Sequence, residues 1–381
     1  MIASALGALA VSIWCYLIFA RGGFWLLRDP NPIDRHDLAA KPVAVIVPAR
    51  DEARVVGGAI ESLLAQDYPG PFHVFLVDDE SSDGTAGVAR QAAGIAGKTN
   101  RLTIIQATPR PAGWTGKVWA VSEGIQEAGS FPAEYYLLTD ADIVHDPANL
   151  RQLVIRAQSG GYDLVSLMVE LRCQSWAERT LIPAFVFFFI MLYPPAWVEK
   201  PGKRTAAAAG GCILIQCDAL VAMGGITAIR SKLIDDCALA QKMKGSGRRI
   251  WLGLTSTTRS IRDYPSLNEV SRMISRNAFT QLRHSSLLLG LTCLGMLLTF
   301  IFPCLLVFVG GLPSTLGLTA WLLMSITFLP TLRYYRRSVF CAPLLPLIAL
   351  FYMAATLDSA VAYWRGKGGL WKGRVQDAGT S

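Results

Sequence analysis

The sequence predicts an α/β fold with a mostly parallel sheet, set between apolar segments at both ends of the chain. Strand-like apolar runs alternate with helical stretches, and each run ends in polar and acidic residues. The composition is 52% hydrophobic, with a mean hydropathy of +0.36. Strands that alternate with helices form parallel sheets, and this hydropathy is high for a soluble protein. We therefore expect an integral membrane protein with one α/β domain.

Three strand-like runs carry the polar ends. They continue into Pro48-Ala-Arg-Asp-Glu52, Asp78-Asp-Glu-Ser-Ser-Asp-Gly-Thr85 and Asp140-Ala-Asp142. A helix is predicted over 51–66, and an Ala-rich helix is predicted to follow the capping residues that end at Thr85. In open parallel sheets the ligand binds outside the carboxyl ends of the strands. These strand ends are therefore candidate site residues.

The most informative motif is Asp140-Ala-Asp142, at the end of the third run. Carboxylates placed there can hold a divalent cation bound to a diphosphate. The same spacing occurs in ordinary turns, where Asp side chains accept hydrogen bonds from backbone N–H groups. Taken alone, the motif favours the turn, and the same alternative applies to Asp78 and Asp79.

Together the motifs resemble the family 2 glycosyltransferases, whose GT-A fold is a Rossmann-like α/β fold with a mostly parallel sheet. The matching segments, in the family's order, are the three strand ends above, Gly116-Lys117 and Asp235-Asp236 with Leu239. Three further segments resemble the hopene-associated membrane glycosyltransferases. They are Ala20-Arg-Gly-Gly-Phe-Trp25, Gly113-Trp-Thr-Gly-Lys117 and Leu181-Ile-Pro-Ala-Phe-Val-Phe-Phe-Phe189.

The resemblance implies transfer of a sugar from a nucleotide sugar, with UDP as the expected nucleotide. It implies Mg²⁺ or Mn²⁺ at Asp142 as the direct ligand, with Asp140 facing the ribose or the metal. The nucleotide-sugar site would contain Pro48, Arg50, Glu52, Asp78, Asp79, Lys117, Asp140 and Arg276. Lys117 would place its charge against the diphosphate; the alternative is a solvated loop lysine.

An inverting transfer needs a carboxylate that removes the proton from the acceptor hydroxyl. By resemblance this base is Asp236, the second residue of the acidic pair, with Asp235 in a supporting role at the acceptor site. Two acids at a helix start also stabilise the helix dipole, which is the alternative explanation for the pair.

One difference from the family's motifs affects the expected product. Many membrane-bound relatives carry a Gln/Arg-x-x-Arg-Trp motif after the base, whereas here Met273 stands at the first position and Asn277 follows Arg276. Arg272 or Gln281 could replace the side chain that is missing from this motif. The departure disfavours polymer synthesis, so we expect one sugar to be moved to a lipid, hopanoid-related by resemblance. A polysaccharide or polyprenyl-phosphate sugar synthase and a catalytically silent membrane scaffold remain alternatives.

The apolar segments predict a multi-pass protein of the inner (plasma) membrane with a cytoplasmic catalytic domain, because arginines follow segments 2–20 and 286–330. The predicted units are a transmembrane anchor (1–28), the glycosyltransferase domain (41–265) with an interfacial segment (181–198), an interfacial or acceptor-site segment (266–285), a C-terminal transmembrane region (286–364) and a basic tail (365–381). Segment 181–198 could instead be a buried core helix. Within the C-terminal region, 286–330 reads as a helical hairpin, and 339–364 as either a span or a re-entrant segment.

The formal net charge of +8 fits cytoplasmic loops, attraction to anionic lipid, or a diphosphate site. The basic residues do not form a nucleic-acid-binding module, so no nucleic-acid partner is expected. The 8 cysteines are scattered without a Cys-x-x-Cys pair, which argues against disulfides and zinc. His145 is expected to be a turn residue rather than a metal neighbour.

Overall fold

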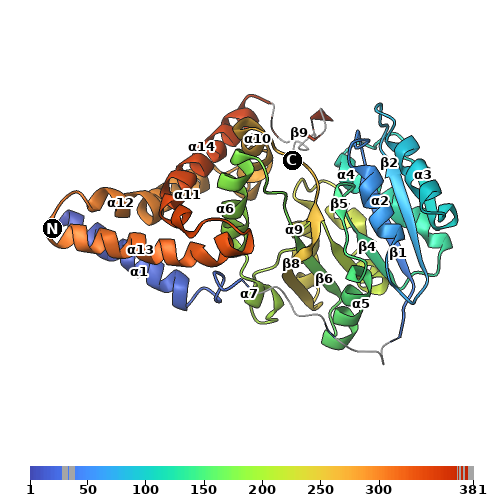
Figure 1. The fold of residues 1–381 in the computed structure, drawn as a ribbon, viewed down its shortest axis with the longest axis horizontal. Helices are drawn as coiled ribbons and strands as arrows, with labels where there is room; N and C mark the ends of the chain where they lie inside the picture. The colour runs from blue at the N-terminus through green and yellow to red at the C-terminus, as the bar shows by residue number, and fades with distance from the viewer. Residues whose placement is uncertain (28–32, 34–38, 367, 369, 372–373, 376–381) are drawn as a thin grey trace. The chain divides into compact units, whose positions relative to one another are not determined.

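The computed structural model describes residues 1–27, 33, 39–366, 368, 370–371 and 374–375. Arg28 and most of the predicted basic tail therefore lie outside the described residues. The chain divides into two compact units (Figure 1). We call them the helical unit (Met1–Leu27, Cys173–Ala196, Asp263–Leu370) and the sheet unit (Arg28–Arg172, Trp197–Arg262, Trp371–Ser381). Segment 173–196, inside the predicted catalytic domain, thus belongs to the helical unit.

Over the described residues, the sheet unit contains one sheet of eight strands in the order β3-β2-β1-β4-β7-β6-β8-β5. Its strands are β1 (Val43–Ala49), β2 (Phe72–Asp78), β3 (Leu102–Gln106), β4 (Tyr135–Leu138), β5 (Ile143–Val144), β6 (Leu164–Glu170), β7 (Ile213–Gln216) and β8 (Ile250–Ser260). The pairs β1-β2, β1-β4, β2-β3 and β6-β8 are parallel, and β4-β7, β6-β7 and β5-β8 are antiparallel. The predicted α/β fold with a mostly parallel sheet is confirmed.

Strands β1, β2 and β4 lie side by side and run in the same direction. Ala49 pairs with Asp78, and Ile46 pairs with Leu138, so all three strands end at one edge of the sheet. The register brings the polar segments predicted as site residues to that edge, because each follows directly on its strand.

Helices cover both faces of this sheet. They are α2 (Val56–Leu64), α3 (Thr85–Ile95), α4 (Gly116–Glu127), α5 (Asn149–Gly160), α8 (Cys217–Ala222) and α9 (Asp235–Gly245), with short helices η1 (Thr99–Arg101), η2 (Ala128–Ser130) and η3 (Ile226–Ile229). Side chains alternate between the faces of a strand. The face with Val45 and Val47 packs against α2, α3 and α5, and Ile46 and Val77 face α4.

Helix α4 approaches the sheet closely at Gly124. A Cβ atom there would lie 2.6 Å from Ile46 Cγ2 and 2.9 Å from Val77 Cγ2. Only glycine fits without displacing these buried side chains. The contact fixes the height of α4 above the sheet, and the first turn of α4 carries Lys117.

The helix predicted from residue 51 begins at Val56 instead. The residues before it bind the loop after β2: Asp51 Oδ1 accepts from Ser82 N (2.8 Å), and Glu52 N donates to Thr85 Oγ1 (2.8 Å). Asp51 also has φ of 48°, which a regular helix does not permit. These nonlocal hydrogen bonds replace the first helical turn and join two of the strand-end loops.

The helical unit contains the apolar segments. Its elements are α1 (Ile2–Phe19), α6 (Trp176–Leu192), α10 (Leu267–Gln281), α11 (Ser286–Met296), the π-helix η4 (Leu297–Ile301), α12 (Phe302–Leu306), α13 (Gly311–Tyr334), η5 (Val339–Leu344) and α14 (Leu345–Trp364). Along the chain, the helical unit ends and the sheet unit resumes within helix α7 (Pro195–Glu199). Strand β9 (Leu370–Trp371) pairs with β10 (Arg374–Val375).

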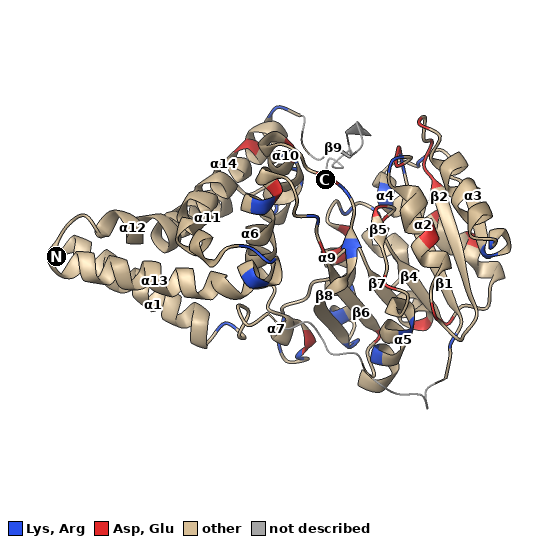
Figure 2. Ribbon diagram, in the orientation of Figure 1, with Lys and Arg blue, Asp and Glu red and all other residues tan. Residues whose placement is uncertain are grey.

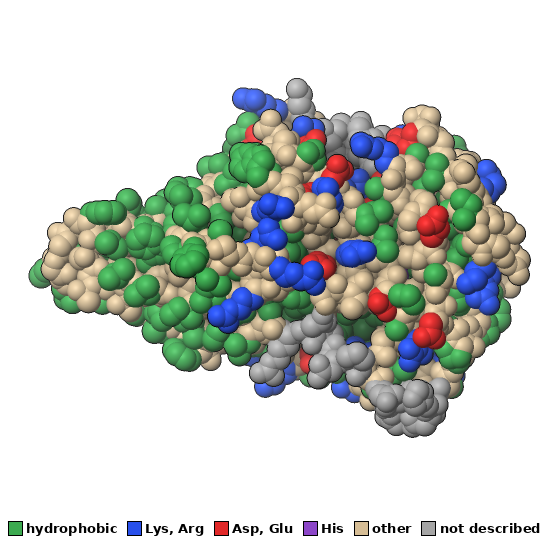
Figure 3. Space-filling model, in the orientation of Figure 1, with side chains coloured by type: hydrophobic (Ala, Val, Ile, Leu, Met, Phe, Trp, Pro, Cys, Tyr) green, Lys and Arg blue, Asp and Glu red, His purple; other side chains and the backbone are tan. Residues whose placement is uncertain are grey.

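Among the described residues, five helical segments are long and apolar enough to cross a membrane: Ile2–Phe19, Trp176–Glu199, Ser286–Leu306, Gly311–Tyr334 and Val339–Trp364. Figure 2 shows almost no charged residues along most of α1, α11, α12 and α13, and Figure 3 shows hydrophobic side chains covering this surface. The predicted hairpin is a pair of helical segments separated at residues 307–310. The segment around 181–198 is half buried within the protein and also has the length of a span.

Helix α1 packs on the hairpin within the helical unit. Trp14 is fully buried, and its Nε1 donates to Thr299 O (2.9 Å) in the π-helix η4. At the end of α1, Arg21 Nε donates to Met191 O (3.1 Å) near the end of α6. Because a π-helix and a helix end both leave backbone carbonyls without helical partners, these two side chains satisfy groups that the apolar segments cannot.

Candidate active site

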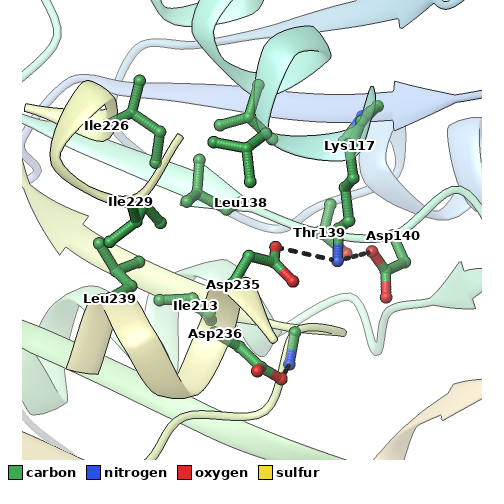
Figure 4. A pocket seen from close by; sticks show the side chains of 14 residues that line it. Lys117, Leu138, Thr139, Asp140, Ile213, Ile226, Ile229, Asp235, Asp236 and Leu239 are labelled. Carbon is green, nitrogen blue, oxygen red and sulfur yellow. Dashed lines mark hydrogen bonds and ion pairs between the residues drawn. The ribbon is translucent and has the colours of Figure 1, made fainter. Parts of the chain in front are cut away.

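A pocket in the sheet unit opens at the edge where β1 and β4 end. Figure 4 shows apolar side chains on one side of this pocket and charged side chains on the other. The apolar lining comprises Val118, Val121, Leu138, Ile213, Ile226, Ile229 and Leu239. The charged residues are Lys117 from α4, Asp140 after β4, and Asp235 and Asp236 from the start of α9. Four of the predicted site residues therefore lie in one pocket, and Pro48 of β1 also lines it.

Lys117 joins two carboxylates across the pocket. Its Nζ lies 2.7 Å from Asp140 Oδ1 and 3.4 Å from Asp235 Oδ2 (Figure 4). Burial alone lowers the pKa of Lys117, but the charges of Asp140, Asp235 and Asp236 together raise it well above its usual value. The ammonium is therefore protonated at neutral pH. The alternative of a solvated loop lysine does not apply, because the side chain lies in α4 between acids that come from different elements.

Asp236 is held by two backbone N–H groups. Gly210 N donates to Oδ2 (2.9 Å) and Cys237 N donates to Oδ1 (2.7 Å). Burial, followed by the charge of Asp235, raises the pKa of Asp236 to about 6, although Lys117 and both N–H groups lower it. A carboxylate with a pKa near the working pH is well suited to accept a proton. The position at the start of α9 also favours negative charge there, so the helix-dipole explanation and the base assignment are compatible.

Gly210 is a site residue that the sequence did not single out. A Cβ atom at this position would lie 3.1 Å from Lys117 Nζ and 3.3 Å from Asp236 Oδ2. Any side chain would crowd the two charged groups. The signal in the sequence is the pair Gly210-Gly211, which lies one residue before β7 but carries no charge or polar side chain that would mark a site.

Asp142 lies beside a second cation that the sequence analysis also missed. Arg262 Nε lies 3.0 Å from Asp142 Oδ2, and Arg262 Nη2 lies 2.5 Å from Glu52 Oε1. Ser260 Oγ donates to the same Asp142 oxygen (2.9 Å). Polar residues at the end of β8 are a strand-end signal of the kind seen after β1, β2 and β4. They were overlooked because that end contains Ser and Arg rather than an acidic pair.

Asp78, the last residue of β2, and Asp79, which follows it, have two different roles. Asp78 Oδ1 accepts from Ser81 N (2.9 Å), which is the turn capping expected as the alternative for one of the two aspartates. Asp79 is 2% exposed. Arg50 Nη1 donates to Asp79 O (2.5 Å) and lies 3.5 Å from Asp79 Oδ2. Arg50 thus links the end of β1 to the end of β2.

Three predicted residues belong to the helical unit and not to this cluster. Arg272, Arg276 and Gln281 lie on α10. Gln281 Nε2 donates to the hydroxyl of Tyr193, which follows α6. The structure thus gives Gln281 a contact inside its own unit, and the roles of all three remain predictions.

His145 is a buried residue directly after β5 rather than the turn residue that was expected. Asn149 Nδ2 donates to His145 Nδ1 (2.9 Å), and the other ring nitrogen is 2.9 Å from Thr139 Oγ1. Burial lowers the pKa of His145 to about 3, so the ring is neutral. Both nitrogens are engaged with the protein, which excludes the ring as a ready metal ligand.

Asp140 and Asp142 suit a divalent cation that arrives with a phosphate ligand. Within the described residues no group of three or more His, Cys, Asp or Glu side chains is arranged to hold a metal ion. Mg²⁺ in phosphate-transferring sites is bound by one or two carboxylates together with substrate phosphates and water, so a pair of carboxylates is sufficient. The Asp140 side chain is 35% exposed and can turn toward such a ligand. The donor set therefore fits a hard cation shared with a diphosphate.

The chain is similar to known glycosyltransferases. The family model described as glycosyltransferase like family 2 matches residues 40–280. Two curated relatives are undecaprenyl-phosphate 4-deoxy-4-formamido-L-arabinose transferases, from Aeromonas hydrophila subsp. hydrophila and Serratia proteamaculans. They are 26% and 25% identical over 142 residues, which is 37% of this chain and 40% of each relative. The chain thus matches well under half the length of these relatives.

Among solved structures, the chain resembles a mannosyltransferase from Pyrobaculum calidifontis in complex with GDP-Man and Mn²⁺. The TM-score is 0.56 and the identity is 18%, with 96% of this chain and 99% of that chain covered. At this identity the likeness supports the fold, including the helical segments outside the sheet unit. Since the family model spans well over half of the chain, the protein belongs to the glycosyltransferase family 2 and is a glycosyltransferase of GT-A fold.

Proposed function

We propose that this protein is a membrane-bound, metal-dependent, inverting glycosyltransferase that moves one sugar from a nucleotide sugar to a lipid acceptor. The observation that carries the proposal is the pocket in which Lys117 lies between Asp140 and the acidic pair Asp235-Asp236. It combines groups suited to a leaving diphosphate with a carboxylate suited to accept a proton. The five candidate membrane spans support a lipid acceptor.

The donor would lie along the strand-end edge. Asp140 and Asp142 would hold Mg²⁺ or Mn²⁺, which supplies positive charge to the diphosphate as the glycosidic bond breaks. Lys117 would add a fixed charge near the same diphosphate. The other residues proposed for the nucleotide are Pro48, Arg50, Glu52, Asp78 and Asp79, with Arg276 from α10. UDP is the proposed nucleotide, on the strength of the family resemblance.

Asp236 would act on the acceptor. Two backbone N–H groups orient its carboxylate, and its pKa of about 6 leaves it mostly ionised at neutral pH. It would take the proton of the acceptor hydroxyl as that oxygen attacks the anomeric carbon, so that the configuration inverts. Asp235 would support this step through its ion pair with Lys117.

The acceptor is proposed to be a lipid alcohol, hopanoid-related by the closer resemblance. Arg272 and Gln281 on α10 are the proposed supporting residues on the acceptor side. A second candidate acceptor is a polyprenyl phosphate, because the two curated relatives are named as undecaprenyl-phosphate sugar transferases. A phosphate acceptor is already mostly ionised at neutral pH and has little need of a base, so Asp236 favours the alcohol.

We place the protein in the inner (plasma) membrane as a multi-pass protein, with the sheet unit in the cytoplasm. The support is the run of arginines at and after the end of α13 and Arg21 after α1, since basic residues accumulate on the cytoplasmic side. A nucleotide-sugar donor is available on that side.

The direct test is mass spectrometry of lipid extracts from cells with and without the protein. A glycosylated lipid present only with the protein would support the proposal, and its acceptor part would distinguish an alcohol from a phosphate. Purified protein in nanodiscs, supplied with UDP-sugars and GDP-sugars in parallel, would identify the nucleotide. Absence of transfer from every donor would favour a silent scaffold.

A further inference from the structure

The guanidinium of Arg262 joins two carboxylates of the proposed donor site. Its Nε lies 3.0 Å from Asp142 Oδ2 and its Nη2 lies 2.5 Å from Glu52 Oε1. The Asp142 and Glu52 side chains are 9% and 10% exposed, and that of Arg262 is 30% exposed. One cation thus neutralises two nearly buried carboxylates from different strand ends and still reaches solvent.

The sheet itself places this arginine. Strand β5 pairs antiparallel with β8, so that Ile143 is opposite Ser260. Beyond this pair, Ile261 N donates to Asp142 O (2.9 Å) and Ser260 Oγ donates to Asp142 Oδ2 (2.9 Å). The chain leaving β8 therefore runs directly beside Asp142. The contact of Arg262 with Asp142 follows from strand register rather than from a freely moving loop.

A divalent cation at Asp142 would compete with this arrangement. It would need oxygen of the same carboxylate that Arg262 and Ser260 engage through Oδ2. A cation arriving alone adds positive charge beside a guanidinium that already neutralises the carboxylate, which is unfavourable. A cation arriving with a diphosphate brings negative charge as well, and phosphate oxygens are good bidentate partners for a guanidinium.

We propose that Arg262 is a built-in counter-charge of Asp142 that makes divalent-cation binding depend on a nucleoside diphosphate. Without ligand it keeps Asp142 and Glu52 oriented and neutralised. With both ligands bound, the guanidinium would turn from Asp142 to the diphosphate, and the Asp142 carboxylate would then be available to hold the cation. Arg262 is therefore a positioning residue, and cation and nucleotide each tighten the binding of the other. This inference rests on the proposed function.

The test is Mn²⁺ binding, measured by calorimetry and by electron paramagnetic resonance on the full chain in detergent. Titrations are made without nucleotide, with UDP and with GDP. The wild type is expected to bind Mn²⁺ weakly alone and tightly with one of the nucleotides. Arg262→Gln is expected to bind Mn²⁺ alone about tenfold more tightly and to gain less from the nucleotide. Asp142→Asn reports any Mn²⁺ binding elsewhere.

Metal-free stability provides a second readout. Arg262→Gln leaves two nearly buried carboxylates without this cation, so its melting temperature should fall without metal and recover with Mn²⁺. The matched control is Arg248→Gln, which removes an arginine 3.3 Å from Asp163 in the same unit. It should not change Mn²⁺ affinity, and Mn²⁺ should not restore its stability.

The inference would be overturned if Arg262→Gln bound Mn²⁺ without nucleotide no more tightly than the wild type, while the wild type still coupled the two ligands. That result would leave the proposed function standing. A wild type that binds no Mn²⁺ even with UDP or GDP would count against both. If Arg262→Gln cannot be purified, Arg262→Lys serves instead, because an ammonium keeps the charge without the two-pronged geometry. It should show a smaller gain of the same sign, and no gain would again overturn the inference.

Discussion

The ammonium of Lys117 lies 2.7 Å from the carboxylate of Asp140. Lys117 lies in the first turn of α4, and Asp140 lies just after β4, the next strand in the chain. The ion pair therefore joins α4 to β4. The same ammonium is 3.4 Å from Asp235. A single cation therefore connects the proposed metal-binding end of the site to the acidic pair that contains the proposed base.

Replacing Lys117 should impair both the proposed metal-binding end of the site and the acidic pair. Lys117→Gln removes a positive charge from the proposed diphosphate position, so we expect the rate of sugar transfer to fall by about a hundredfold or more. Because the Lys117 charge lowers the pKa of Asp236, the acidic limb of the remaining pH–rate profile should move to higher pH. The measurement is UDP release as a function of pH.

The control for Lys117→Gln is Lys41→Gln. Lys41 also pairs with a carboxylate, at 2.8 Å from Glu134, but both side chains are well exposed and lie outside the pocket. Exposed pairs contribute little, so this variant should keep its rate and its profile. A Lys117→Gln enzyme that behaves like Lys41→Gln would contradict the proposed role.

Metal removal should abolish transfer. In EDTA the diphosphate loses its neutralising charge, and activity should return on addition of Mn²⁺ or Mg²⁺. Asp142→Asn keeps the shape of the side chain and removes its charge, so the protein should fold but not turn over with either metal. Asp67→Asn is the matched control, because Asp67 is 61% exposed and pairs with Arg151 away from the pocket. Full activity in EDTA would refute the metal site.

The sequence predicted those parts of the site that depend on local pattern. Asp140, Asp235 and Lys117 were predicted because short motifs at strand and helix ends resemble those of the family 2 glycosyltransferases, and the fold then brings such ends to one edge of the sheet. Arg262 and Ser260 were missed because their role depends on the pairing of β5 with β8, which joins residues more than a hundred positions apart. Gly210 was missed because its importance lies in the space it leaves free.

The same distinction applies to the fold. The alternation of apolar runs and helical stretches was sufficient to predict a mostly parallel α/β sheet. It was not sufficient to place the start of α2, because Asp51 and Glu52 make hydrogen bonds to the loop after β2 instead of a helical turn. Local pattern identified the apolar segments, but contacts such as Trp14 with Thr299 in η4 depend on tertiary packing.

The arginines after α1 and at the end of α13 predict the membrane topology. A cysteine placed at Leu312, in the first turn of α13 just after the break in the hairpin, should react with a membrane-impermeant maleimide added from the periplasm. A cysteine at Asn100 in the sheet unit should react only after the inner membrane is opened. Protein with its native cysteines alone gives the background. The opposite labelling pattern would remove the nucleotide-sugar proposal, because the donor would be on the wrong side.

The two residues of the acidic pair should have different roles, with Asp236 in the chemical step and Asp235 in a supporting role. Asp236→Asn cannot accept a proton, so donor binding should survive while transfer to an alcohol falls by at least about a hundredfold. Asp235→Asn should be milder, with a larger effect on donor or acceptor affinity, because Asp235 acts through Lys117. The measurements are glycolipid formation in nanodiscs and, separately, nucleotide binding by calorimetry.

The pH dependence provides an independent test of Asp236 as the base. The base must be ionised, and burial and Asp235 raise its pKa to about 6, so the wild-type rate should be constant above that pH and fall as the pH drops through it. Asp236→Asn should lose this acidic limb together with its activity. If Asp236→Asn transfers sugar as fast as the wild type, the base assignment fails, and a phosphate acceptor, which needs no base, becomes the better explanation of the site.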